Sequence, residues 1–220
     1  GVDGVFYTLS QEKESWLYDP RVGELDAASL YAYDPDTGAA SPALTTSNRA
    51  RVALYRQTGG PMSLIVVADE GDDGSGGRLA LNVTGLHEGT VVVQDDPEGT
   101  TDTLAWDAET GEALFFWKWG IKDSDGAVIE GVDETLCAGF SLGESVGLEG
   151  IDLLTGGDEE RVALPTLRPF SVCATVCCAP DPGGEVCDGL GDRVGEDVRR
   201  TRRDQHVVLD ADPAKADPVL

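Results

Sequence analysis

The residues Asp123-Ser124-Asp125-Gly126 have the composition of a loop that binds calcium. The alternate side chains of Asp123 and Asp125 could direct carboxylate oxygens toward one ion, and Gly126 would permit a sharp bend. An EF-hand also needs a helix on each side of its loop, and the sequence around these residues does not predict helices. Two interpretations therefore stand side by side: a plain acidic hairpin turn, which the composition favours, and a calcium site at Asp123 and Asp125.

Other acidic pairs offer weaker candidates for chemistry. Asp95-Asp96 and the stretch from Asp69 to Asp73 could supply metal ligands, and paired carboxylates are also the catalytic groups of glycoside hydrolases. However, 41 of the 220 residues are Asp or Glu, so pairs of this kind arise from composition alone. The acidic pairs by themselves therefore assign no activity.

Two overlapping segments, residues 139–143 and 143–147, match the G-x-S-x-G pattern of a serine hydrolase, with Ser141 and Ser145 at the central positions. A nucleophilic serine of this type stands on a sharp turn between a parallel strand and a helix. The chain shows no alternation of strands and helices, and the only histidine after these serines is His206. We therefore interpret the segments as a loop rich in glycine and serine, with a hydrolase as a minor alternative.

The five cysteines are the next reactive groups: Cys137, Cys173, Cys177, Cys178 and Cys187. In an exported chain they predict disulfides that attach the C-terminal end to the main body. We expect two bridges drawn from Cys137, Cys173, Cys178 and Cys187, with one thiol left over. A zinc site is the alternative, although the spacing C-x3-C-C-x8-C is not that of a zinc ribbon or finger.

The segment Asn82-Val83-Thr84 is the one N-glycosylation sequon in the chain. It lies in a predicted strand beside a turn. Short sequons occur often by chance, but this one agrees with an exported surface protein, so Asn82 is a predicted glycosylation site.

The formal net charge of −25 comes from 41 acidic residues against 16 basic ones, of which four are lysines. This composition resembles that of proteins from extreme halophiles such as haloarchaea, which implies a surface that holds water in concentrated salt. There the mutual repulsion of carboxylates is short-ranged, because the screening length falls to about 3 Å at 1 M salt. The alternative is an acidic secreted protein that binds divalent cations. Either way, nucleic acid and anionic membrane surfaces are unsuitable partners.

Two further features indicate an extracellular or cell-surface location. The chain opens on Gly1-Val2-Asp3, from which we expect a processed N-terminus, and no run of eighteen apolar residues predicts a membrane span. Residues 185–190, Glu-Val-Cys-Asp-Gly-Leu, resemble the start of the Cys-Asp-Gly acidic repeats of large bacterial surface proteins. That resemblance covers six residues and transfers no functional residue.

The elements that must position these groups are predicted to be short β-strands. Apolar residues alternate at Leu79–Val83, as they do in a strand with one buried face. Residues 114–119 are apolar on both faces, which predicts a central strand covered on each side. Asp107–Gly111 predicts a hairpin turn with one residue at positive φ. Further predicted strands are Phe6–Leu9, Ser29–Tyr33, Arg51–Arg56, Leu64–Val67, Thr90–Val93, Ile151–Leu154, Val162–Leu164 and Phe170–Val176, and one helical turn is predicted at Ser10–Trp16.

Ten to twelve short strands at this spacing predict an all-β fold, an antiparallel β-sandwich or jelly roll. We expect the main core near Trp106, Trp117 and Trp119. The predicted domains are a sandwich at residues 1–178 and a cysteine-containing extension at residues 179–220.

These features together predict a non-enzymatic structural protein of the cell surface, with a filament-forming subunit as its specific form. Self-association would use a sheet edge or tail, for which Val5–Leu9 and Gln205–Leu209 are the predicted segments. The main alternative is a secreted module that binds surface glycans or another ligand through aromatic side chains such as Trp16, Tyr31 and Tyr33. A secreted hydrolase is the third possibility.

Overall fold

The computed structural model describes residues 5–34, 40–69, 76–95, 102–121, 123–156, 161–164 and 167–176. Of the described residues, 58% lie in strands and 3% in helix, and the strands form two packed sheets. The predicted all-β sandwich is therefore confirmed. The predicted extension, residues 179–220, lies outside the described residues.

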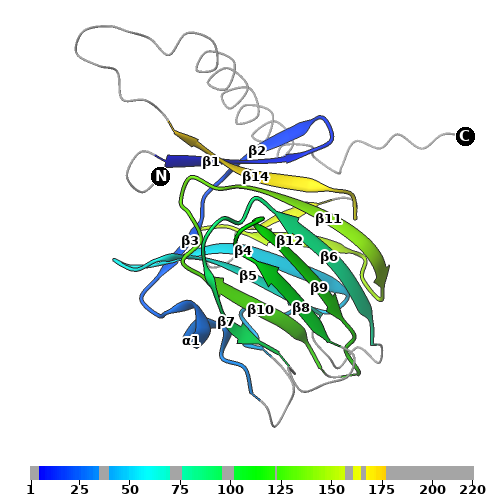
Figure 1. Ribbon diagram of the computed structural model, residues 1–220. Helices are drawn as coiled ribbons and strands as arrows, with labels where there is room; N and C mark the ends of the chain where they lie inside the picture. Colours follow the sequence, from blue (N-terminus) through cyan, green and yellow to red (C-terminus); the bar gives the residue numbers. More distant parts are fainter. Residues whose placement is uncertain are drawn as a thin grey trace, which may run out of the picture. The chain divides into compact units, whose positions relative to one another are not determined.

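Sheet A has seven strands in the spatial order β2-β1-β14-β11-β6-β9-β8, and every neighbouring pair is antiparallel (Figure 1). Its strands are β1 (Val5–Gln11), β2 (Glu14–Tyr18), β6 (Arg78–Thr84), β8 (Thr103–Asp107), β9 (Glu112–Trp117), β11 (Cys137–Val146) and β14 (Phe170–Val176). The predicted turn joins β8 to β9. Gly111 has a φ of 70°, and the side chain of Asp107 accepts a hydrogen bond of 2.9 Å from the backbone N–H of Glu109.

Sheet B has the order β13-β12-β4-β5-β10-β7, and β3 also pairs with β4. Its strands are β3 (Arg21–Gly23), β4 (Arg49–Gln57), β5 (Met62–Ala68), β7 (Thr90–Gln94), β10 (Asp125–Glu130), β12 (Gly150–Leu154) and β13 (Arg161–Leu164). The pairs β12–β4 and β3–β4 are parallel, so the sandwich is not antiparallel throughout.

The main hydrophobic core lies between the two sheets. Alternation along β6 and β9 sends every second side chain inward, among them Leu81, Phe115 and Trp117. Sheet B contributes apolar side chains from β4, β5, β10 and β12 to the same cluster. Trp119 is buried in this core and Trp106 packs against it, so the predicted position of the core is confirmed.

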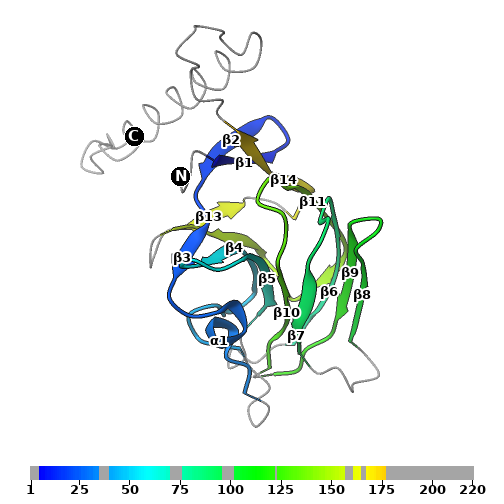
Figure 2. The ribbon, with the colours of Figure 1, turned by 60° about the vertical axis from the view of Figure 1, so that its left-hand side comes forward.

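A third, smaller layer covers the outer face of sheet B. Helix α1 (Ala27–Tyr31) and residues 40 and 44 pack there in a second apolar cluster with β4, β5 and β10. Figure 2 shows α1 on the side of sheet B that faces away from sheet A. No helix in the described ranges has the length and apolar character needed to cross a membrane.

The predicted strand at Ser29–Tyr33 is therefore wrong, because most of it belongs to α1. The helix begins because Asp26 acts as its N-cap: the side chain accepts a hydrogen bond of 2.7 Å from the backbone N–H of Ser29. Hydrogen bonds from Ser29 also hold the pKa of Asp26 below its ordinary value. Ala32, with a φ of 47°, ends the helix in the left-handed conformation.

Three other local predictions are wrong. The predicted helical turn at Ser10–Trp16 is instead the hairpin that joins β1 to β2. The glycine- and serine-rich segment at 139–147, predicted as a loop, falls largely in β11. Strand β9, predicted to be covered on both faces, exposes Leu114 and Phe116, because only the edge strand β8 lies beyond it and no described layer covers this side of the sheet.

One buried ion-pair group holds three strands of sheet B together. Asp152 on β12 is fully buried, and its carboxylate lies 2.7 Å from Arg49 of β4 and 2.7 Å from Arg161 of β13. Each oxygen of the carboxylate accepts a hydrogen bond from one of the two guanidinium groups. Since a buried charge is tolerated only when it is paired, these three side chains depend on one another.

We expect Asp152→Ala to lower the free energy of unfolding by roughly 2–4 kcal/mol, somewhat less than for a fully buried pair, because both arginines keep some exposure to water. The matched control is Glu144→Ala, which removes the exposed ion pair with Arg78 and should cost less than about 1 kcal/mol. Urea denaturation of both variants measures the difference. Equal losses would mean that Asp152 does not tie the strands together.

Candidate functional site

The outer faces of the two sheets differ, and the difference defines the candidate site. Sheet B is covered by α1, whereas the outward side chains of four neighbouring strands in sheet A are exposed or half-buried. We call this surface the open face. Its ten residues are Gly139, Ser141 and Gly143 of β11, Ala80, Asn82 and Thr84 of β6, Leu114 and Phe116 of β9, and Thr103 and Ala105 of β8.

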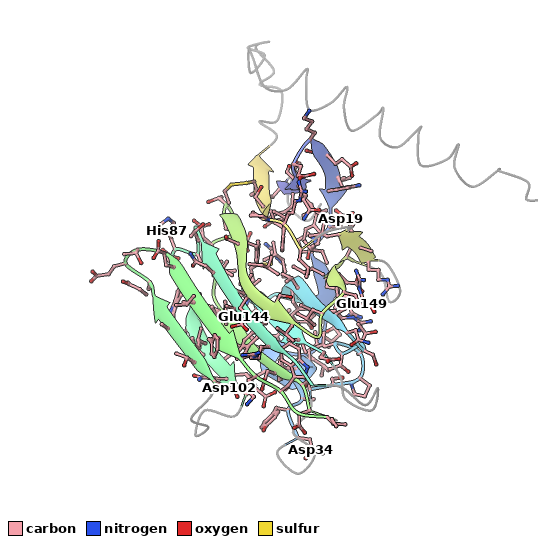
Figure 3. All side chains as sticks on the ribbon, turned by 90° about the vertical axis from the view of Figure 1, so that its right-hand side faces the viewer. Asp19, Asp34, His87, Asp102, Glu144 and Glu149 are labelled. Atoms are coloured by element: carbon pink, nitrogen blue, oxygen red, sulfur yellow. A yellow bond between two sulfur atoms is a disulfide. The ribbon has the colours of Figure 1, made fainter. Side chains whose placement is uncertain are left out.

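None of these ten residues is charged, although the chain carries a net charge of −25. Charged groups lie at the two ends of the strands instead. Asp107 and Glu112 flank the turn at one end, and Arg78 pairs with Glu144 at the other. Figure 3 shows His87 and Asp102 at opposite ends of the same strands. The open face is therefore an uncharged area within an acidic surface.

Apolar side chains on the open face come from β9. Leu114 is 50% exposed and Phe116 is 37% exposed. Both have register partners with small side chains, Ala105 and Thr103 on β8, and so they stand out from the sheet. Exposed apolar groups that cluster on one surface of a soluble protein mark a place where another group binds.

The predicted glycosylation residue lies at the centre of the open face. Asn82 is flanked across the strands by Ser141 on one side and Leu114 on the other. Because side chains alternate along β6, Asn82 and Thr84 both point outward while Val83 is fully buried. The two residues that a glycosyl transferase reads are therefore on the same exposed surface.

The two residues of the predicted calcium site differ in burial. Asp125 starts β10 and is buried, whereas Asp123 is half-buried and its carboxylate packs against Gly120. Glu134, the twelfth residue counted from Asp123, lies beyond the far end of β10 and pairs with Arg56 at 2.6 Å. Among the described residues there is no group of three or more His, Cys, Asp or Glu that could hold a metal ion. Calcium at Asp123 and Asp125 stays a prediction.

Asp125 instead belongs to a buried polar cluster with Asp95, which follows β7. The hydroxyl of Tyr31 donates a hydrogen bond of 3.1 Å to Asp95, whose backbone N–H donates to the carbonyl of Gly126 at 3.0 Å. The pKa of Tyr31 lies well above its ordinary value, first because of burial and then because of the charges of Asp95 and Asp125. Tyr31 therefore remains a neutral donor at any ordinary pH.

This cluster connects the third layer to sheet B. Tyr31 belongs to α1, and the buried hydroxyl of Ser124 accepts a hydrogen bond of 2.8 Å from the backbone N–H of Ala40. Both segments are thereby attached to the ends of β7 and β10. The burial of Tyr31 also removes it from the predicted sugar-binding aromatics, and Trp16 is half-buried against the main core.

Asp69, the first residue of the acidic stretch 69–73, is another buried aspartate. The structure buries it at the end of β5, with a φ of 62°. Its carboxylate accepts hydrogen bonds from the indole N–H of Trp119 at 2.6 Å and from the backbone N–H of Asn48 at 2.9 Å. Nothing in the sequence distinguishes Asp69 from its acidic neighbours, because its partners Trp119 and Asn48 are distant from it along the chain.

The serines of the G-x-S-x-G segments do not occupy a strand-to-helix turn. Both lie in β11: Ser141 is exposed on the open face, opposite Asn82, and Ser145 follows the bulge in the pairing with β6. The hydroxyl of Ser145 is buried, and no described side chain forms a hydrogen bond with it. The described residues therefore give neither serine a neighbouring base.

Of the five cysteines, the structure joins Cys137 to Cys173. The two residues are direct register partners on β11 and β14, so the disulfide links neighbouring strands of sheet A. The bridge agrees with the predicted set of bonded cysteines. Cys177, Cys178 and Cys187 lie outside the described residues.

A cavity of about 200 Å³ lies near the start of β1 and is lined by Val5, Tyr7, Asp19, Pro20, Val22, Arg56, Met62 and Gly156. Two of its polar side chains, Tyr7 and Arg56, are engaged in the fold. The hydroxyl of Tyr7 donates to the carbonyl of Glu134 at 2.7 Å, and Arg56 pairs with the Glu134 carboxylate. Burial raises the pKa of Tyr7. The cavity therefore offers a small, mainly apolar space beside one arginine.

Comparison of the chain with protein-family models, curated proteins and solved structures finds no match. The functional argument consequently depends on the open face, the buried polar groups and the cavity.

The Cys137–Cys173 bridge, with a sequence separation of 36, should contribute about 2–4 kcal/mol to stability, because it restricts the unfolded chain. We expect the double variant Cys137→Ala/Cys173→Ala to unfold at a lower urea concentration than the oxidised wild type. If a reductant lowers the stability of that variant further, the additional loss measures the contribution of disulfides formed by the remaining cysteines. An unchanged unfolding midpoint in the double variant would contradict a stabilising role.

Proposed function

We propose that this chain is a non-enzymatic structural protein of the extracellular surface that associates with copies of itself. The observation that carries the proposal is the use of its buried polar groups. Asp152, Asp69 and Tyr31 each attach one strand or layer to another. Cys137–Cys173 is a further attachment, and disulfides are typical of exported proteins.

The proposed contact for self-association is β2, one of the two edge strands of sheet A. Val5–Leu9, the segment predicted from the sequence, belongs to β1, which is paired with β2 on one side and β14 on the other. Its residues Tyr7–Leu9 therefore have backbone partners on both sides, so the prediction of a free edge is wrong for them. Gln205–Leu209 lies outside the described residues. Strand β2 has one partner in the described sheet, so its other edge can pair with a second chain.

Leu17 on β2 is 43% exposed, and its register partner is Thr8. We expect wild-type protein to form concentration-dependent oligomers or filaments, and Leu17→Glu to weaken them by adding a charge beside the free edge. The matched control is Leu25→Glu, which places the same charge at a side chain that is 54% exposed and outside any strand. Multi-angle light scattering across a concentration series measures the mass of each protein. A wild-type protein that stays monomeric at all concentrations would contradict the proposal of self-association.

The acidic composition supports a halophilic setting for this surface protein. With 41 acidic and 16 basic residues, the folded chain repels itself at low salt. We expect the free energy of unfolding to rise when KCl is increased from about 0.1 M to 1 M, over which the screening length falls from about 10 Å to about 3 Å. Thermal unfolding at a series of KCl concentrations tests this. A melting temperature that falls with added KCl would argue for an ordinary acidic protein.

A module that binds a small ligand is the second candidate, supported by the cavity beside Arg56. The walls of this cavity are mainly apolar, and pockets that orient small molecules have this character. Thermal-shift screening with monosaccharides and small organic acids would test it. A ligand-dependent rise in melting temperature that Val22→Trp removes would favour this candidate over a purely structural role.

A further inference from the structure

We propose that Asn82 carries an N-linked glycan whose first sugars lie over Leu114 and Phe116 and cover the open face. This inference rests on the proposed extracellular location, which exposes the chain to glycosyl transfer. It goes beyond the sequon itself, because it assigns the glycan a structural task at one surface of the sandwich.

The position of the sequon supports the assignment. Asn82 and Thr84 point outward from β6, and neither is fully buried. Leu114 is the direct register partner of Asn82, and Phe116 is the partner of Ala80, two residues along the same strand. Side chains in such direct and diagonal positions are about 5 Å and 7–8 Å apart. A sugar attached to the Asn82 amide is therefore adjacent to both apolar side chains.

The chemistry of the surroundings fits a saccharide. Sugar rings present C–H groups on their faces and hydroxyl groups at their edges. Leu114 and Phe116 offer apolar surface for the faces. The hydroxyl of Thr103 lies beside Phe116 on β8, and the hydroxyl of Ser141 lies beside Asn82 itself on β11. None of the ten residues of the open face carries a charge that would have to lose its water under the glycan.

The covalent step is a group transfer from a lipid-linked oligosaccharide diphosphate. The amide nitrogen Nδ2 of Asn82 bonds to the anomeric carbon of the sugar, and the bond between that carbon and the phosphate oxygen breaks. The lipid diphosphate leaves with the electron pair, and the amide nitrogen gives up one proton to a base of the glycosyl transferase. No electrons are gained or lost overall.

The transfer must precede folding. Strand β6 is paired with β11 on one side and β9 on the other, with Asn82 inside both ladders. Its backbone is thus engaged in the finished sheet and is not available to enter the active site of a transferase. The glycan is therefore added to the extended chain and then directed outward by the alternation of β6.

This position also leaves the proposed assembly contact accessible. In sheet A, β2 is four strand positions from β6, or about 19 Å at the usual spacing between strands. A glycan that covers β6 and β9 would prevent two open faces from associating while the β2 edge stays free.

The test uses the full chain produced in a host that performs N-glycosylation, analysed by intact and peptide mass spectrometry. We expect a glycan mass on Asn82 in the wild type and in Thr84→Ser, which keeps the sequon. Complete loss of that mass is expected in Asn82→Gln and in Thr84→Ala, which both destroy it. An unmodified Asn82 in the wild type overturns the proposal and leaves the open face for a protein partner.

A second measurement tests whether the sugars cover the apolar side chains. An apolar fluorescent dye should bind the aglycosylated Asn82→Gln and Thr84→Ala proteins but not the wild type or Thr84→Ser. Adding Phe116→Ser to Asn82→Gln should abolish the extra dye signal. If dye binding is the same with and without the glycan, the sugars do not cover the face. Self-association through β2 is measured independently by Leu17→Glu, so either proposal can fail alone.

Discussion

The inward side chains of the two sheets pack against each other, and every other feature of the sandwich depends on that contact. Phe115 and Trp117 lie on the inner face of β9 with ring centroids 4.9 Å apart, facing apolar side chains of β4, β5 and β10. Burial of such rings is the dominant favourable term in folding. Because alternation places one face of each strand in this core, it also determines which residues remain outside.

Polar groups inside the sandwich act as attachments between its parts. Asp152 joins three strands, Asp69 connects the end of β5 to Trp119, and Tyr31 with Asp95 joins α1 to sheet B. Each of these carboxylates is held by donors from distant parts of the chain, so each is a constraint on the fold.

The outer faces of the two sheets differ in how their apolar side chains are covered. On sheet B, Tyr31 and Leu44 come from the chain itself and cover the strands. On sheet A, Leu114 and Phe116 remain exposed beside the sequon, and the glycan proposed on Asn82 would cover them. The edge strands also differ. Strand β7 carries a bulge in its pairing with β10, and a bulge discourages pairing with a further strand. No bulge interrupts the pairing of β2 with β1.

The sequence by itself determined the strand-rich class, the site of the main core and the outward direction of Asn82, because these follow from alternation at period two along each strand. It also identified Cys137 and Cys173 as bonded cysteines, although not as partners. Predictions from local patterns were wrong where contacts between distant residues determine the structure. Most of Ser29–Tyr33 is helical, with Asp26 as the N-cap, and β9 is uncovered on one face. Only the tertiary structure brought Asp95 to Asp125, buried Asp69 and placed β1 between two partners. Those outcomes depend on which strands become neighbours, and the order of strands in a sheet is set by packing over the whole core rather than by any short segment.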